Sequence, residues 1–345
     1  PAGTPAASGA AAATSAAPVA AAASAAPSQK VVISTDVLRA TVDTLGGTLV
    51  RLELLKHRDA NDPKSQVHVF EDDPQRPYQA QSGFVPAQAG QALPTHLTPM
   101  KVLTTERALA DGSQQLELRL ESDAAEGRRV VKTYTFRRGD YVIGVKHQLF
   151  NDGTTAVLPS LYLQLERHGN PPPGESQFYF TFTGPAVYTD ATKFQKIDFK
   201  DIEKGKADHA KNGNDGWVGM VQHYFASAWL VEPGSPREFR TTRTGDNRYA
   251  VAMVQPLGEL APGASKTHEA RLFAGPQEEN KLAALAPGLE LVKDYGWFTV
   301  LAKPLFWVLD QLHKVIANWG WSIVALVVLL KIAFYWLNAS AYRSM

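Results

Sequence analysis

The chain has 345 residues, with 35 lysine and arginine residues against 34 aspartate and glutamate residues, and its formal net charge is +1. This balance gives no argument for nucleic-acid binding, so no nucleic acid is expected among the partners. The absence of cysteine excludes disulfides, thiolate metal sites and a cysteine nucleophile, although it leaves the cellular compartment open.

The first 29 residues are mostly alanine, with proline, serine and glycine between the alanines. Alanine favours helix, but Pro5, Pro18 and Pro27 interrupt the run, and no charged or periodic apolar residues give it a face to bury. Residues 1–29 are therefore expected to form a flexible linker.

The next 250 or so residues show strand patterns. Residues 31–55 alternate apolar and polar residues on both sides of Gly46-Gly47, which predicts two strands joined by a turn that requires positive φ. The period of two returns, between turn residues, at 114–122, 128–138, 141–152, 160–167, 178–184, 216–232, 237–244, 248–255 and 267–277. So many short strands predict a large, mainly β antiparallel sandwich.

A highly charged stretch interrupts this pattern at residues 192–216, TKFQKIDFKDIEKGKADHAKNGNDG. It is interpreted as a solvated loop that bridges strands, with a partner-binding surface as the alternative. Residues 281–292, KLAALAPGLELV, then change towards helical spacing. The β domain is therefore expected over residues 30–285, and connecting and amphipathic helices are expected over 286–318.

No arrangement of residues in the sequence is typical of catalysis or metal binding. The nine histidines never adopt an HExxH or similar ligand spacing, and no GxSxG, GxGxxG or P-loop motif occurs. Asp208-His209 is expected to be a surface pair, and His223 is expected to lie in the core or line a cleft rather than act as a base. We expect no catalytic residue, no bound metal and no cofactor, and the protein is not expected to be an enzyme.

An amphipathic pattern begins at Pro304, which suits the first turn of a helix because proline has no N–H to donate. Apolar residues recur at spacings of three and four over 305–316, while Asp310 and Lys314 fall on the other side. Such a helix either caps the β domain or lies in a membrane surface; we favour the membrane surface because the helix leads directly into an apolar span. The residues expected at the membrane interface are Trp297, Phe306, Trp307, Leu309, Trp319 and Trp321.

Almost every residue from Trp319 to Leu337 is apolar. At ~1.5 Å per residue this length nearly crosses a hydrocarbon core of ~30 Å, and residues 319–338 are predicted to form a transmembrane helix. One helical face of this span carries Val327, Lys331, Tyr335 and Asn338. The lysine either snorkels to the headgroups or lines a wet cavity between helices, and the residues alone leave both interpretations open.

The junction DYGWFTVLAKPLFWVLDQLHKVIANWGWSI and the following VLLKIAFYWLNASAYRSM resemble the region around the second transmembrane helix of the YidC family of membrane protein insertases. The segments STDVLRATVDTLGGTLVRLELL, TGPAVYTDATKFQKIDFKDIEK, GWVGMVQHYFASAWL and LAPGASKTHEARLFAGPQ resemble successive parts of that family's periplasmic domain. The resemblance covers about residues 30–345. Its most specific part is NWGWSI with the lysine-bearing span.

This resemblance implies a periplasmic antiparallel β-supersandwich of the galactose mutarotase type, followed by an interfacial amphipathic helix and one transmembrane α-helix. It also implies that residues 339–345 begin a cytoplasmic segment of a multi-pass protein of the bacterial inner membrane. Both ends of the chain are expected to be cuts in that longer protein.

The family assists insertion and folding of integral membrane proteins through a hydrophilic groove, alone or with the Sec translocon. The resemblance implies nascent membrane proteins, the Sec translocon, the ribosome and the lipid bilayer as partners. It places Lys331 at the basic groove position, with Val327, Tyr335 and Asn338 as further client contacts. Val327 stands where the family has a groove threonine, and Trp336 stands where it often has proline.

The alternative is a membrane-anchored periplasmic carbohydrate-binding or mutarotase-like protein. A convergent Glu/His pair over a sugar-sized cleft would favour this alternative, whereas further apolar spans beyond the segment would favour the insertase.

Overall fold

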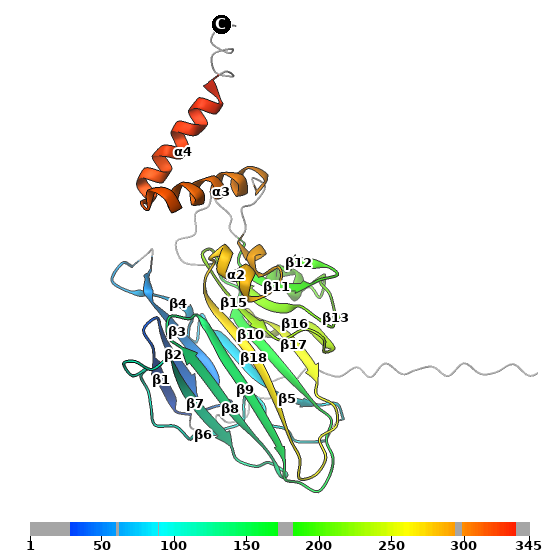
Figure 1. The fold of residues 1–345 in the computed structure, drawn as a ribbon. Helices are drawn as coiled ribbons and strands as arrows, with labels where there is room; N and C mark the ends of the chain where they lie inside the picture. The colour runs from blue at the N-terminus through cyan, green and yellow to red at the C-terminus, as the bar shows by residue number, and fades with distance from the viewer. Residues whose placement is uncertain (1–27, 60–61, 89, 172–181, 294–298, 336–345) are drawn as a thin grey trace, which may run out of the picture. The chain divides into compact units, whose positions relative to one another are not determined.

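The computed structural model describes residues 28–59, 62–88, 90–171, 182–293 and 299–335. The chain divides into two compact units, a β domain that ends at Val292 and a helical unit that begins at Lys293 (Figure 1). The linker predicted over 1–29 lies almost entirely outside the described residues.

Within the described ranges, the β domain contains two nine-stranded sheets. The first sheet consists of β1 (Lys30–Ser34), β2 (Leu38–Asp43), β3 (Thr48–Arg58), β4 (Gln66–Phe70), β5 (Tyr78–Pro86), β10 (Pro159–His168), β13 (Asn212–Gly213), β16 (Arg237–Gly245) and β17 (Arg248–Pro256). The second sheet consists of β6 (Met100–Val102), β7 (Gln115–Ser122), β8 (Arg128–Arg137), β9 (Val142–Asn151), β11 (Gly184–Thr189), β12 (Lys193–Lys196), β14 (Trp217–Val221), β15 (Phe225–Leu230) and β18 (Ser265–Pro276).

The strand order of the first sheet is β1-β2-β3-β5-β10-β17-β16-β13, with β4 paired to β3. That of the second sheet is β12-β11-β14-β15-β18-β9-β8-β7-β6. Neighbouring long strands run antiparallel, as in β8 with β9 and β10 with β17, and the second sheet lies in front of the first in Figure 1. The predicted mainly β antiparallel sandwich is confirmed by this topology.

Alternating apolar residues form the core between the sheets. In β7, Leu116, Leu118 and Leu120 are buried, whereas Glu117 and Arg119 at the alternate positions are exposed. Each fully buried aliphatic or aromatic side chain contributes about 1.5–3 kcal/mol to folding. The period of two in the sequence therefore decides which face of each strand turns inward.

A second, smaller core lies on the other face of the second sheet. Leu282 of helix α2 (Glu279–Leu285) and Val292 at the end of the 3₁₀ helix η1 (Leu289–Val292) are buried there against residues of β11, β14, β15 and β18. The helical spacing expected at 281–292 is confirmed. Because these contacts continue to Val292, α2 and η1 belong to the β domain.

The charged stretch over 192–216 is not one solvated loop, so that interpretation is wrong in part. It contains β12, helix α1 (Phe199–Glu203) and β13. Helix α1 contacts β16, where Glu203 pairs with Arg243 at 3.7 Å. The helix thus covers part of a sheet edge that would otherwise expose unpaired backbone groups.

Six described strands had no sequence signal that we recognised: β4, β5, β6, β11, β12 and β13. β5, with the sequence YQAQSGFVP, lies between β3 and β10 and is buried on both faces over much of its length, so it shows no clean alternation.

Residues 31–55 hold three strands rather than two, with Gly46 and Gly47 at the turn between β2 and β3. Their φ angles of +67° and +56° confirm the predicted positive-φ turn. The strand expected at 178–184 lies mostly outside the described residues.

The helical unit contains α3 (Thr299–Ile316) and α4 (Trp319–Ala333). The amphipathic helix predicted from Pro304 is present, but Pro304 lies inside α3 and not in its first turn. The helix begins five residues earlier, since Thr299 to Lys303 continue the same helical spacing and the proline removes only one intrahelical hydrogen bond.

In the ranges that the structure describes, none of the helices is both long and apolar enough to cross a membrane. Helix α4 has 15 residues, and the end of the span predicted over 319–338 lies outside those ranges. The transmembrane helix therefore stays a prediction.

Candidate functional site

A tight elbow joins α3 to α4. Ala317 adopts a left-handed conformation with φ +56°, and Oδ1 of Asn318 accepts a hydrogen bond from the Trp321 N–H at 3.2 Å, which caps α4. The rings of His313 and Trp319 stack with centroids 3.8 Å apart and an interplanar angle of 9°. Side chains from both helices therefore hold the elbow closed.

Asn318→Ala is expected to destabilise the first turn of α4 by about 1 kcal/mol, because the Trp321 N–H loses its acceptor. Hydrogen exchange of the Trp321 amide in detergent micelles should therefore accelerate by about fivefold. Asn318→Asp keeps an acceptor oxygen and is the matched control, which should exchange at the rate of the unmodified chain. Equal exchange rates in the alanine and aspartate variants would contradict the capping role.

The residues predicted at the membrane interface lie on both sides of this elbow. Three of the tryptophans are exposed, namely Trp307, Trp319 and Trp321. Phe306 and Leu309 are half-buried, and Trp297 lies outside the described residues. Exposed indoles at the junction of an amphipathic and an apolar helix are typical of the aromatic belts at membrane surfaces.

The predicted groove residues share one face by their spacing of four. Val327 and Lys331 lie on α4 and Tyr335 lies just beyond its end, and all three are exposed. Asn338 lies outside the described residues. Apolar side chains on the other sides of α4 are exposed as well, among them Ile323, Val324, Val328, Leu329 and Ile332. The helix thus presents apolar surface all round, with one cation in it.

The interior of the β domain contains a row of basic side chains that the sequence analysis missed. Lys132 on β8 lies directly opposite His147 on β9, which lies directly opposite His268 on β18. Lys132 and His147 are fully buried or nearly so, and His268 is half-buried. The signal was present, because Lys132 occupies an inward position of the alternating segment RRVVKTYTF.

Lys132 stabilises the turn between β2 and β3 through hydrogen bonds. Its Nζ donates to the carbonyl oxygens of Gly46, Ser82 and Gly47 at 2.6, 3.1 and 3.4 Å, and burial lowers its pKa to about 7. The hydroxyl of Tyr134 donates to the Gly47 carbonyl as well, at 2.5 Å. These bonds satisfy carbonyl groups that the glycine turn would otherwise leave unpaired inside the domain.

The buried histidines do not form a catalytic arrangement. Ser82 Oγ and His147 Nε2 lie 2.8 Å apart, as a nucleophile and a base would. However, His147 Nδ1 has no hydrogen-bond partner among the described residues, so no carboxylate orients the ring. Both residues are buried, and neither lines a cavity named below.

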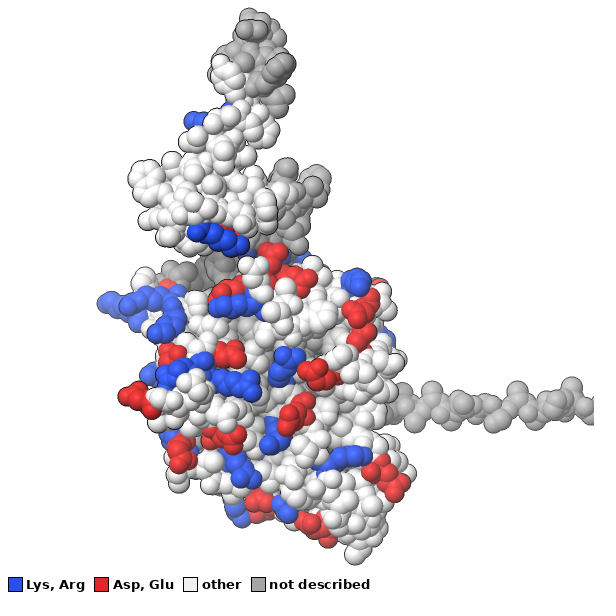
Figure 2. Space-filling view, in the orientation of Figure 1, with Lys and Arg blue, Asp and Glu red and all other residues white. Residues whose placement is uncertain are grey.

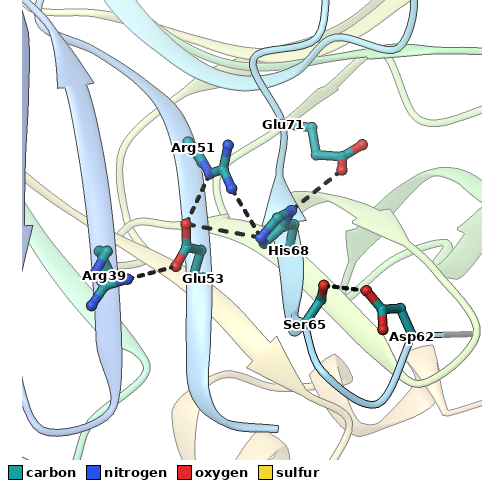
Figure 3. Close-up of polar contacts among 7 residues, drawn as sticks. All are labelled: Arg39, Arg51, Glu53, Asp62, Ser65, His68 and Glu71. Atoms are coloured by element: carbon teal, nitrogen blue, oxygen red, sulfur yellow. Dashed lines mark hydrogen bonds and ion pairs between the residues drawn. The ribbon is translucent and has the colours of Figure 1, made fainter. Parts of the chain in front are cut away.

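A ladder of charged side chains crosses β2, β3 and β4 on the surface (Figure 3). Glu53 accepts from Arg39 at 3.3 Å and from Arg51 at 2.9 Å, and Arg51 also donates to Nε2 of His68 at 3.2 Å. His68 Nδ1 lies 3.4 Å from Glu71, and this contact lowers the pKa of the Glu71 carboxyl. Because the charges satisfy one another, the ladder is a set of cross-strand pairs with little free charge to bind a ligand.

The cavities on the described part of the β domain include the following three. The largest of these three, about 490 Å³, lies on the first sheet beside Glu238 and Arg240. The second, about 370 Å³, lies on the second sheet around Gly144, where Lys146 and Glu269 face each other across β9 and β18. The third, about 190 Å³, lies beside Tyr188 and Trp217. None of these three cavities is lined by a histidine.

Basic and acidic side chains are interspersed over the face of the β domain seen in Figure 2. Both signs alternate across β7, β8, β9 and β18, which lie in front in this orientation. This face offers no broad field of one sign, in agreement with the net charge of +1.

Two histidine predictions are wrong. His209, expected at the surface, is buried and lies 2.7 Å from the Ala210 carbonyl oxygen and 3.1 Å from the Thr241 hydroxyl. His223, expected in the core or a cleft, is exposed in the turn between β14 and β15 beside Tyr224. Neighbouring apolar residues suggested an inward position for His223, but the turn directs its ring outward.

The molecule combines a two-sheet antiparallel β domain with an amphipathic helix and an apolar helix. The family profile described as the YidC periplasmic domain matches residues 30–308. The chain belongs to the YidC family.

Relatives named membrane protein insertase YidC are identical to this chain at about half of the aligned positions. The protein of Cupriavidus necator is 53% identical over 317 residues, which are 92% of this chain and 56% of the relative. That of Bordetella avium is 48% identical over 318 residues, again 92% of this chain and 56% of the relative. The chain thus spans about half the length of the curated relatives it matches. These relatives are named as insertases and not as enzymes.

Solved structures of similar fold include an aldose 1-epimerase homologue from Escherichia coli K12, with 12% identity and a TM-score of 0.42 over 72% of this chain and 99% of that chain. A galactose mutarotase related enzyme from Lactobacillus acidophilus has 9% identity and a TM-score of 0.43 over 71% of this chain and 97% of that chain. Similarity at this level carries no argument about function.

Proposed function

We propose that this chain is the periplasmic part and the second membrane helix of a membrane protein insertase of the bacterial inner membrane. Membership of the YidC family and the insertase names of its relatives support this proposal. Its clients are nascent membrane proteins, and its other partners are the Sec translocon, the ribosome and the lipid bilayer.

The observation that carries the proposal is the surface of α4. Apolar side chains such as Ile323, Val328 and Ile332 are about half exposed or more on several sides of the helix. A helix that is apolar all round is stable in lipid or inside a bundle, and not in water. Lys331 on the same helix needs water or an anionic partner, as a cation in lipid does. Lipid around the apolar sides of α4 and a hydrated groove on the Lys331 side would give the apolar side chains an apolar environment and the lysine its water.

The side chains of α3 support the proposal that this helix lies along the membrane surface. Lys314 and Asp310 form an i,i+4 ion pair at 2.8 Å, so both lie on the polar side, as predicted from their spacing. Trp307 is 64% exposed and free to enter the headgroup region. The elbow at Asn318 then turns the chain from the surface helix into the span.

The proposed mechanism involves no covalent step. Moving a polar segment into hydrocarbon costs several kcal/mol when its hydrogen bonds are lost. A hydrated face with Lys331, Tyr335 and Asn338 lowers this cost by offering the client water, hydrogen bonds and one positive charge. Because Val327 stands in place of a threonine, the face is apolar one helical turn before Lys331.

The alternative, a carbohydrate-binding or mutarotase-like protein, predicted a convergent Glu/His pair over a sugar-sized cleft. None of the three cavities named above is lined by a histidine. No observation favours this alternative.

Charge reversal at Lys331 tests the proposal in the full-length protein reconstituted in liposomes. Lys331→Glu is expected to reduce insertion of a client with an acidic translocated segment by about tenfold, because the groove then repels the segment. Lys331→Arg should retain insertion, and a strongly apolar client should be affected least. The measurement is protease protection of the inserted client.

Lys314→Glu is the matched control, since it reverses a charge on the polar side of α3 and leaves the face of α4 unchanged. It should insert both clients normally. Full insertion of both clients by Lys331→Glu would refute the groove role, as would equal losses in the two variants.

A further inference from the structure

A small cavity lies beside Tyr188 and Trp217. Its volume is about 190 Å³, and it lies where Leu285 to Pro287 close over β11, β14 and β15. Apolar atoms of Leu230 and Leu285 contribute to its walls. Pockets of this kind, apolar with a few polar groups at the rim, are where proteins take up side chains or small ligands.

The walls of the pocket are rigid. The rings of Tyr188 and Trp217 stack with centroids 5.7 Å apart and an interplanar angle of 8°, and Trp217 Nε1 donates to the Pro287 carbonyl at 3.0 Å. Gly216 has φ +91°, and a Cβ there would lie 1.9 Å from the Tyr188 carbonyl oxygen. At Gly288, a Cβ would lie 2.0 Å from the Tyr188 ring. Close approaches that only glycine permits therefore constrain the aromatic wall, which lowers the cost of ordering it on binding.

The rim of the pocket is acidic. Asp190, Asp215 and Glu232 line it together with a single cation, Arg271, which pairs with Glu232 at 3.3 Å. Asp190 accepts from the Tyr188 hydroxyl at 3.0 Å, and Asp215 accepts from the Asp190 N–H at 3.1 Å.

Neither aspartate forms an ion pair within the part of the chain that the structure describes. Burial and the Asp190 carboxylate raise the pKa of the Tyr188 phenol, with further contributions from Glu290 and Asp215. The lining of the pocket thus carries three carboxylates against one guanidinium, and Asp215 also interacts electrostatically with Arg237 of β16.

We propose that this pocket binds an arginine or lysine side chain in an extended segment of a partner protein. The aliphatic stem of such a side chain packs on the apolar walls, and its charged end reaches Asp190 and Asp215 at the rim. The stacked aromatic wall adds a favourable surface for a cation. An apolar side chain would fill the space but offer the two carboxylates no positive charge.

Outside the described ranges, the given sequence contains one lysine or arginine, Arg343, and residues 1–27 and 172–181 contain none. We place the basic side chain on another protein. This inference is independent of the insertase proposal, because it concerns a pocket of the β domain and not the Lys331 face.

The test uses the whole chain in a neutral detergent and measures the indole N–H resonance of Trp217 by NMR. The probes are the capped peptides Ala-Ala-Arg-Ala-Ala and Ala-Ala-Leu-Ala-Ala. The arginine peptide should shift this resonance with a millimolar dissociation constant, about tenfold tighter than the leucine peptide. Added salt should weaken binding of the arginine peptide and leave the leucine peptide unaffected.

Two variants separate charge from shape. The double variant Asp190→Asn, Asp215→Asn should lower the affinity for the arginine peptide by about tenfold. Leu285→Trp, which fills the cavity, should abolish binding of both peptides. Glu269→Gln in the second cavity is the control and should bind like the unmodified chain. Equal affinities for the two peptides, or unchanged binding in the double variant, would overturn the proposal, as would no shift of Trp217 at about 10 mM peptide.

Discussion

Gly46→Ala is expected to destabilise the β domain by about 3–5 kcal/mol or to prevent its folding. Gly46 has φ +67°, and a Cβ there would lie 2.1 Å from the carbonyl oxygen of His96. The backbone around His96 cannot withdraw freely, because the His96 N–H donates to the Tyr162 hydroxyl at 2.9 Å and Lys132 holds the Gly46 carbonyl. The substitution therefore adds a steric clash to an unfavourable dihedral angle.

Urea unfolding of residues 28–293, followed by far-ultraviolet circular dichroism, measures this loss. Gly139→Ala is the matched control, because Gly139 has φ +69° but a Cβ added there would meet no atom within 4 Å. It should cost about 1 kcal/mol, the contribution of the dihedral angle alone. If both variants lose the same free energy of unfolding, the close approach of Gly46 to the His96 backbone does not constrain the turn between β2 and β3.

Acidification from about pH 7 to pH 4.5 is expected to destabilise the β domain by several kcal/mol. Burial, with a smaller contribution from Arg167, lowers the pKa of His168 from 6.5 to about 4. Burial, with smaller contributions from Lys132 and His268, lowers the pKa of His147 well below 6.5. Between pH 6.5 and 4 the unfolded chain binds protons at these positions and the folded domain does not.

The sign of the effect follows from this difference. Stability is constant with respect to these two groups above pH 6.5 and falls as the pH falls from 6.5 towards 4. For His168, the difference between 6.5 and about 4 corresponds to about 3 kcal/mol at most. In addition, protonation of His168 Nδ1 would remove the acceptor that the Asn170 N–H uses at 3.1 Å.

Urea midpoints of residues 28–293 between about pH 8 and pH 4.5 measure this dependence. His168→Gln should flatten the curve between pH 6.5 and 4, whereas His223→Gln, at an exposed turn position, should leave it unchanged. A midpoint that stays constant or rises on acidification would show that the buried histidines are already charged in the folded domain.

The sequence by itself determined the features that depend on near neighbours in the chain. Alternation placed Leu116, Leu118 and Leu120 on one face of β7, and the pair Gly46-Gly47 marked a turn that needs positive φ. Spacings of three and four located the amphipathic helix and the shared face of Val327 and Lys331. The motifs around NWGWSI pointed to the family, which the comparison with relatives then established.

Only the tertiary structure decided which polar residues are buried and what they contact. Lys132, His147 and His268 come from three strands and meet because the register of β8, β9 and β18 places them opposite one another. The pocket at Tyr188 and Trp217 exists because α2 and η1 fold back over the second sheet. Burial and electrostatics depend on contacts between residues far apart in the chain, and a pattern of near neighbours carries no information about which strands pair or which faces become covered.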